Sequence, residues 1–221
     1  MIQLHKVNKY FYKGEAREIH ALRDINLTIE EGEFSLLKGP SGCGKTTLLN
    51  AIGALDGVES GDIYIDEKNI TTLNEDERTT LRLNELGFIF QAYNLVPVLN
   101  VEENIGFIMK LRGFSDKEIR ERVLEIASIL EIDNKLKSLP NTLSGGQQQR
   151  VAVARAVASK PKIILADEPT ANLDSKNSQK LITMMKELNE KEKISILFAS
   201  HDEFIAKSVR RIIKLEDGAL V

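Results

Sequence analysis

One segment near the start of the chain constrains its fold more than any other. Residues 39–46 read G-P-S-G-C-G-K-T and satisfy the pattern G-x-x-x-x-G-K-[ST]. The apolar run Phe34-Ser35-Leu36-Leu37 before them predicts a short buried strand, and residues 45–52 after them have the composition of a helix. Strand, glycine-rich loop and helix in this order are typical of α/β proteins that hold a polyphosphate.

The residue types of the loop explain that preference. Glycines let successive backbone N–H groups converge on phosphate oxygens, and the helix N-terminus adds unpaired N–H groups and a favourable dipole. Lys45 supplies a positive charge for the outer phosphates, and the hydroxyl of Thr46 is a hard oxygen ligand suited to Mg²⁺. The predicted phosphate-binding residues are Gly39, Pro40, Ser41, Gly42, Cys43, Gly44, Lys45, Thr46 and Thr47.

Composition excludes several classes of protein. The 221 residues, 42% hydrophobic and 29% charged, match a soluble globular chain rather than a disordered one. The net charge of −3 lacks the basic character of a dedicated nucleic-acid binder, so no nucleic-acid partner is expected. The single cysteine excludes an intrachain disulfide, and the three histidines form no metal cluster. No stretch approaches the roughly 18 apolar residues of a membrane span, so we expect a cytosolic protein or one bound to a membrane through another protein.

The order of predicted elements indicates one α/β domain. Alternating Ile25, Leu27 and Ile29 predict an early strand, and strands alternate with helices again after residue 150. Between them the chain reads as helical, with a capping box predicted at Ser115 and Glu118. We therefore expect a mostly parallel sheet with an inserted helical subdomain.

A second functional motif follows the strand Ile163-Ile164-Leu165-Ala166. It delivers Asp167 and Glu168 at its carboxyl end, the edge at which α/β sheets bind ligands. Neighbouring strand residues point in opposite directions, so the two acids should have different tasks. We assign Asp167 to Mg²⁺ and Glu168 to positioning the attacking water.

Between these sites lies Leu143-Ser144-Gly145-Gly146-Gln147-Gln148-Gln149-Arg150. With it, the chain resembles the ATP-binding-cassette (ABC) ATPases, whose signature reads L-S-G-G-Q. The resemblance covers essentially the whole chain. It implies a single nucleotide-binding domain over 1–221, with a P-loop NTPase core at about 1–90 and 156–221, an N-terminal antiparallel β part, and a helical subdomain at about 91–155.

The resemblance also implies further site residues. Gln91 matches the family's glutamine switch, which senses Mg²⁺; His201 matches the switch histidine that contacts the γ-phosphate; and Asp174 belongs to the loop that crosses the dimer interface. Phe11 matches the aromatic that stacks on adenine, although Tyr10 and Tyr12 flank it and could take its place.

Ser144, Gly145, Gly146 and Gln147 before a helix form a second anion site. If this site and the phosphate loop face apart, as the family fold implies, two copies would enclose each ATP between the loop of one and the signature of the other. The implied assembly is an ATP-dependent homodimer.

The resemblance implies the cytoplasmic ATPase subunit of a transporter, Mg²⁺-dependent and peripheral to the cell membrane through an integral membrane permease. The motifs look most like the group that serves lipoprotein release, macrolide or peptide export, and cell division. A non-transport ATPase that transmits mechanical force or a signal is the alternative. We also expect residues 95–99 to contact the permease, unless they are ordinary core of the helical subdomain. We expect the Cys43 thiol to react readily when the loop is empty and slowly when nucleotide is bound, unless the side chain points into the core as a small inert group.

Overall fold

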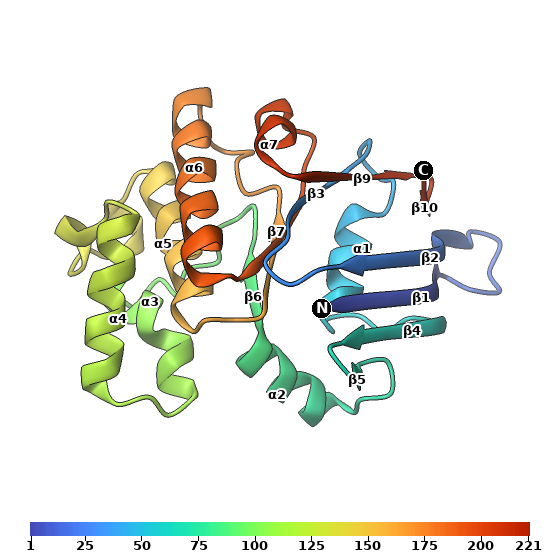
Figure 1. Cartoon of the computed structure of the whole chain (residues 1–221), viewed down its shortest axis with the longest axis horizontal. Coiled ribbons are helices and arrows are strands. Elements are labelled where there is room, and N and C mark those ends of the chain that lie inside the picture. The colour runs from blue at the N-terminus through green and yellow to red at the C-terminus, as the bar shows by residue number, and fades with distance from the viewer.

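Two β-sheets and a group of helices make up the molecule in a computed structural model that describes residues 1–221 (Figure 1). The strands are β1 (Ile2–Phe11), β2 (Ile19–Ile29), β3 (Phe34–Lys38), β4 (Ser60–Ile65), β5 (Lys68–Asn69), β6 (Leu86–Ile89), β7 (Ile163–Asp167), β8 (Ser195–Ala199), β9 (Arg211–Glu216) and β10 (Ala219–Leu220). The helices are α1 (Lys45–Ile52), α2 (Glu75–Glu85), α3 (Val101–Leu111), α4 (Asp116–Ile129), α5 (Gly145–Ala158), α6 (Ser175–Glu192) and α7 (Glu203–Ser208), with short 3-10 turns at Asp133–Lys135 and Pro140–Thr142. None of these helices combines the length and apolarity needed to cross a membrane.

The larger sheet confirms the expected mostly parallel core. Its strand order is β10-β9-β3-β8-β7-β6, and every neighbouring pair except β10 with β9 is parallel. Lys38 of β3, Asp167 of β7 and Ala199 of β8 therefore end at one edge of the sheet.

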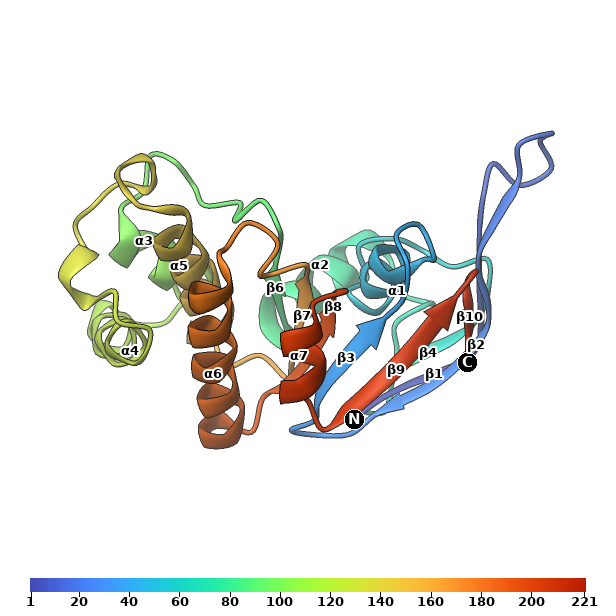
Figure 2. The ribbon, with the colours of Figure 1, turned by 90° about the horizontal axis from the view of Figure 1, so that it is seen from above.

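The smaller sheet is the expected N-terminal antiparallel part, in the order β2-β1-β4-β5. Helix α1 lies between the two sheets, as Figure 2 shows. Its Leu48 and Ile52 are fully buried in a core that joins Ile25 of β2 to Leu165 of β7. The helix that follows the glycine-rich loop is thus held from both sides.

The opposite face of the parallel sheet packs against the helices. Phe34 and Phe198 on this face share a second core with residues of α3, α4, α5 and α6. The Ser115–Glu118 capping box at the start of α4 is confirmed, and α5 has its own box at Ser144 and Gln147. The boundary of the helical subdomain at residues 91–155 stays a prediction.

Arg122 of α4 joins the helical part to the core. Its guanidinium is 7% exposed and donates to Glu192 of α6 at 2.8 Å and to Glu125 at 2.8 Å. It also donates to the carbonyl oxygens of Val157 and Ala158 at the end of α5. The hydrogen bond from Lys191, and to a smaller extent the one from Arg122, lowers the pKa of Glu125 to about 2. One cation therefore ties the middle of α4 to the C-terminal ends of α5 and α6.

We predict that Arg122→Ala lowers the free energy of unfolding by about 3 kcal/mol, because the nearly buried carboxylate of Glu192 loses its partner at 2.8 Å and keeps only Lys160 at 3.8 Å. Urea unfolding measures this. Lys117→Ala is the matched control: its pair with Glu121 spans 3.9 Å with both side chains exposed, so we expect a change within about 0.5 kcal/mol. Equal losses in the two variants would show that Arg122 does not tie the helical part to the core.

Candidate functional site

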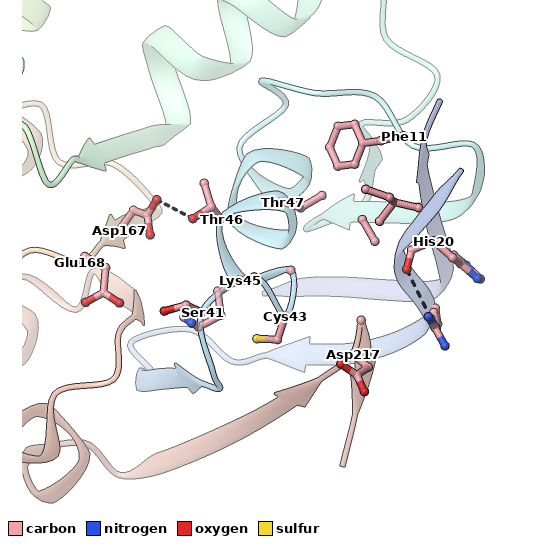
Figure 3. Close-up of a pocket in the computed structure, with 16 residues that line it drawn as sticks. Phe11, His20, Ser41, Cys43, Lys45, Thr46, Thr47, Asp167, Glu168 and Asp217 are labelled. Atoms are coloured by element: carbon pink, nitrogen blue, oxygen red, sulfur yellow. Dashed lines mark hydrogen bonds between the residues drawn. The ribbon is translucent and has the colours of Figure 1, made fainter. Parts of the chain in front are cut away.

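A cavity of about 570 Å³ opens where the parallel strands end (Figure 3). It is lined by loops and strands that lie far apart in the sequence. The lining residues are Phe11, Ile19, His20, Ala21, Arg23, Ser41, Gly42, Cys43, Gly44, Lys45, Thr46, Thr47, Asp167, Glu168, Asp217 and Gly218. The structure therefore brings the glycine-rich loop and the Asp-Glu pair to one site.

Glycine is required at particular points of the loop. Gly42 and Gly44 have φ values of +81° and +107°, a backbone conformation that is strained for any residue with a side chain. A Cβ on Gly44 would also lie 2.7 Å from the carbonyl oxygen of Ala21. A Cβ on Gly39 would lie 2.1 Å from the carbonyl oxygen of Leu215. The turn can therefore pack against β2 and β9 only without these side chains.

Lys45, the first residue of α1, folds back over the loop. Its ammonium donates to the carbonyl oxygens of Gly39 at 2.8 Å and Pro40 at 2.9 Å. The side chain is 9% exposed and lines the cavity. These two bonds hold a positive charge beside the converging N–H groups.

Thr46 and Asp167 meet across the cavity. The hydroxyl of Thr46 donates to Oδ2 of Asp167 at 2.9 Å, as Figure 3 shows. Burial raises the pKa of Asp167, and the negative charge of Glu168 adds to the rise, while the Thr46 hydrogen bond and Lys45 oppose it. A half-buried carboxylate and a hydroxyl form an oxygen-only donor set, which fits Mg²⁺ that keeps waters and phosphate oxygens as its other ligands.

Glu168 lies just beyond β7, and its backbone has a φ of +46°. Strand alternation predicts that the two acids point in opposite directions. This prediction is wrong in its reason, because Glu168 lies outside the strand and a left-handed turn sets the direction of its side chain. Its Oε2 accepts from Ser200 at 2.8 Å, and its Oε1 lies 2.9 Å from Nδ1 of His201. A carboxylate only accepts, so Nδ1 carries the proton.

His201 lines an adjoining hollow of about 290 Å³ rather than the main cavity. Its side chain is 74% exposed. Glu168 lines both spaces. The histidine thus reaches the phosphate loop through Glu168 in this structure.

The three neighbouring aromatics take different positions. Tyr10 stacks on His20 with ring centroids 4.0 Å apart, and the guanidinium of Arg17 covers Tyr12 at 3.8 Å. Phe11 lines the cavity and is 38% exposed (Figure 3). Of the three, Phe11 alone offers a ring to a ligand of this cavity.

Sequence reasoning missed the wall opposite the phosphate loop. His20 and Arg23 of β2 and the Asp217-Gly218 turn line the cavity. The N–H of Gly218 donates to the carbonyl of Cys43 at 3.0 Å, and its carbonyl accepts from the N–H of Arg23 at 2.7 Å. An Asp-Gly pair indicates a turn between strands, but nothing in the sequence indicates that this turn would meet the loop 175 residues earlier (218 − 43).

Other expected site residues do not line this cavity. Gln91 is exposed, and its carbonyl oxygen accepts from the side chain of Asn172 at 2.9 Å. Asp174 caps α6 by accepting from the N–H of Asn177, a hydrogen bond that lowers the pKa of Asp174. Both residues already have structural roles within one chain.

The signature residues also lie outside the cavity. Ser144 caps α5 and Gln147 completes the box. A Cβ on Gly145 would approach the hydroxyl of Tyr93 to 2.8 Å, so a larger residue there would displace the end of the Tyr93 side chain. A single chain therefore does not bring Ser144, Gly145, Gly146 and Gln147 to the phosphate loop.

The expectation of a reactive Cys43 thiol is wrong. The side chain is 5% exposed and belongs to the core around α1. A Cβ on Gly39 would lie only 2.6 Å from its Sγ. The thiol therefore packs inward as a small apolar group, although Cys43 is also among the residues that line the cavity.

Comparison with known proteins agrees with this geometry. Residues 22–171 match the family model for ABC transporters. The chain is 46% identical over 222 residues to MJ0796 of Methanocaldococcus jannaschii, an uncharacterized ABC transporter ATP-binding protein, covering 99% of this chain and 94% of the relative. It is 41% identical to MacB of Aggregatibacter actinomycetemcomitans, a macrolide export ATP-binding/permease protein, over 100% of this chain and 34% of MacB.

Two solved structures of MJ0796 have the same fold, each with a TM-score of 0.91 and coverage of 100% of this chain and 96% of the other. One is a dimer in a post-hydrolysis state bound to ADP and Pi, 43% identical to this chain. The other is a dimeric cassette, 44% identical.

Proposed function

The chain belongs to the ABC transporter family and is an ATP-binding, ATP-hydrolysing protein, and from this premise we propose that it closes in pairs around Mg-ATP and drives a membrane permease. One observation carries the proposal: the Lys45 loop, the Thr46–Asp167 pair and Glu168 share one cavity. The likeness to MacB agrees with the export subgroup that the motifs indicate.

We assign the binding of ATP to the cavity as follows. The N–H groups of the loop and the Lys45 ammonium bind the phosphates, and Phe11 stacks on the adenine. Thr46 and, through water, Asp167 would hold Mg²⁺, with Gln91 as the sensing ligand implied by the family. The metal supplies positive charge for the phosphate oxygens.

Glu168 carries the chemistry of the chain itself. Its carboxylate orients a water for attack on the γ-phosphorus and accepts the proton that the water loses. The bond between phosphorus and the β–γ bridging oxygen breaks, and ADP leaves with the bridging electron pair. His201, whose Nδ1 bonds Glu168, keeps the carboxylate oriented and contacts the γ-phosphate.

The proposed dimer completes each site from a second copy. Ser144 and the N–H groups at the start of α5 form an anion site that one chain keeps apart from its own phosphate loop. In a twofold pair each signature meets the partner's loop, and Asp174 lies at the crossing. The dimeric structures of MJ0796 support this arrangement.

A groove of about 410 Å³ between α2, β6 and α3 is the proposed permease contact. Its walls include Leu55, Phe88 and Phe107, with Arg82 and Arg155 as cations. We infer that it accepts an amphipathic helix of the permease. That MacB is an ATP-binding/permease protein, of which this chain spans about a third, supports such a partner. Through it the subunit would lie at the cytoplasmic face of the cell membrane.

Hydrogen bonds link this groove to the glutamine switch. Arg155 donates to the carbonyl oxygens of Tyr93 and Asn94, two consecutive residues with positive φ just after Gln91. The buried Asn104 binds the backbone of Val96, Leu99 and Asn100. Segment 93–100 is thus tied to α3 and α5, so that movement at Gln91 would reach the partner.

Within the expected contact at 95–99, exposure narrows the surface. Val98 is 79% exposed and Pro97 is exposed, whereas Leu95, Val96 and Leu99 are half-buried. Leu95 packs against the helical core. We therefore propose that the permease contacts Val98 and the groove, which Val96 lines two residues before it.

We predict that Glu168→Gln retains ATP affinity but lowers turnover by about 100-fold or more, because the amide keeps the size of the side chain and loses the base. The variant should form dimers with ATP in size-exclusion chromatography. Glu203→Gln on α7, which lines neither space, is the control and should turn over normally. Wild-type turnover in Glu168→Gln, or monomers with ATP, would contradict the mechanism.

We predict that Val98→Cys in a Cys43→Ala background, labelled with a benzophenone maleimide, photocrosslinks to a membrane protein when bound to membranes of its own cell. Mass spectrometry identifies the product. Leu124→Cys on α4 is the control, since Leu124 is 47% exposed and belongs neither to the groove lining nor to segment 93–100. Equal products at both positions, or none at position 98, would remove this surface from consideration.

A further inference from the structure

Ser200, the residue after β8, touches Glu168 without touching the nucleotide cavity. Its side chain is completely buried. Its hydroxyl lies 2.8 Å from Oε2 of Glu168, and it lines neither the main cavity nor the adjoining hollow. A hydroxyl in this place can act on the reaction only through the carboxylate.

The hydrogen bonds around Ser200 fix which way its proton points. The backbone N–H of Asp202 donates to the Ser200 oxygen at 3.1 Å. The hydroxyl proton is then directed to Glu168, which as a carboxylate can only accept. Each oxygen of Glu168 thus has its own partner, Ser200 at Oε2 and His201 at Oε1.

Asp202 holds Ser200 in turn. One carboxylate oxygen of Asp202 accepts from the N–H of Phe204 at 2.7 Å and caps α7, and the other accepts from the hydroxyl of Thr170 at 2.9 Å. Thr170 is 4% exposed and follows Glu168 by two residues. The segment after β8 is therefore bound back onto the segment after β7.

The backbone of Glu168 needs such support. Its φ of +46° belongs to the left-handed region, which costs a residue with a side chain about 1 kcal/mol or more. Its N–H donates to the carbonyl of Ala199 at 2.8 Å, and its carbonyl accepts from the N–H of Ala171 at 3.2 Å. The backbone is fixed by these two bonds, and the rotation of the carboxyl group is left to Ser200 and His201.

Of these two partners, His201 is exposed and Ser200 is buried. We propose that Ser200 is a positioning residue for hydrolysis: its hydroxyl sets the plane of the Glu168 carboxylate and presents Oε1 for the water. This inference rests on the proposed role of Glu168. Because Ser200 does not touch nucleotide, it acts on kcat and leaves the affinity for ATP unchanged.

Steady-state ATPase assays with Ser200→Ala and Ser200→Cys test the proposal. The alanine variant loses the hydrogen bond to a charged group, and we expect kcat to fall about tenfold or more with KM unchanged within about twofold. The cysteine variant is close in size to serine and donates weakly. We therefore expect its kcat to fall as well, which keeps the test valid if the alanine variant does not fold.

Ser195→Ala is the matched control. Ser195 begins β8, is 5% exposed, and likewise donates and accepts one hydrogen bond, with Glu30 and Gly32, far from the cavity. Its loss should lower the melting temperature and leave kcat unchanged. An equal fall of kcat in Ser195→Ala would show a general structural effect and overturn the proposal.

The double variant Ser200→Ala with Glu168→Gln separates this inference from the proposed function. If Ser200 acts through Glu168, adding Ser200→Ala lowers the residual turnover of Glu168→Gln by less than about twofold. A further tenfold fall of turnover in the double variant would overturn the inference about Ser200 alone. So would wild-type kcat in both Ser200 variants when Glu168→Gln stops turnover. Normal turnover in Glu168→Gln would overturn the proposed function as well.

Discussion

Three neighbouring parallel strands, β3, β8 and β7, end at the same edge of the sheet, and the site depends on this constraint. The loop after β3 carries Lys45, the turn after β7 carries Glu168, and the segment after β8 carries Ser200 and His201. Parallel pairing places these three connections side by side although they lie far apart in the sequence. The antiparallel sheet and the Asp217-Gly218 turn then close the cavity from the other side.

The helical part of the molecule adds what the sheet cannot supply. Its α5 begins with the signature at Ser144, on an element separate from the phosphate loop. The same helix carries Arg155, which binds the backbone of the segment after Gln91. Helix α5, which is proposed to offer phosphate contacts to a partner copy, is therefore also bonded to the segment proposed to contact the permease. Arg122 fixes the far end of α5 to α4 and α6.

Local patterns predicted the parts of the site that short segments determine. The glycine-lysine pattern with its flanking elements gave α1 at Lys45–Ile52, and the apolar run before Asp167 gave β7. Contacts between distant segments could not be predicted in this way. The choice of Phe11 over Tyr10 and Tyr12 depends on which of the three side chains lines the cavity, and the burial of Cys43 depends on packing between two sheets. Strand alternation does not predict the direction of the Glu168 side chain, because β7 ends at Asp167 and the backbone of Glu168 turns with a φ of +46°.

The central claim is that the loop anchored by Lys45 is the nucleotide site, and equilibrium titration with a fluorescent ATP analogue tests it most directly. Lys45→Ala removes a charged donor to the phosphates, so affinity should fall about 100-fold or more. Lys38→Ala is the matched control, because Lys38 ends β3 one residue before the loop and pairs with Glu203 instead. Wild-type affinity in Lys38→Ala with loss in Lys45→Ala is the predicted result. Unchanged affinity in a folded Lys45→Ala protein would contradict the account.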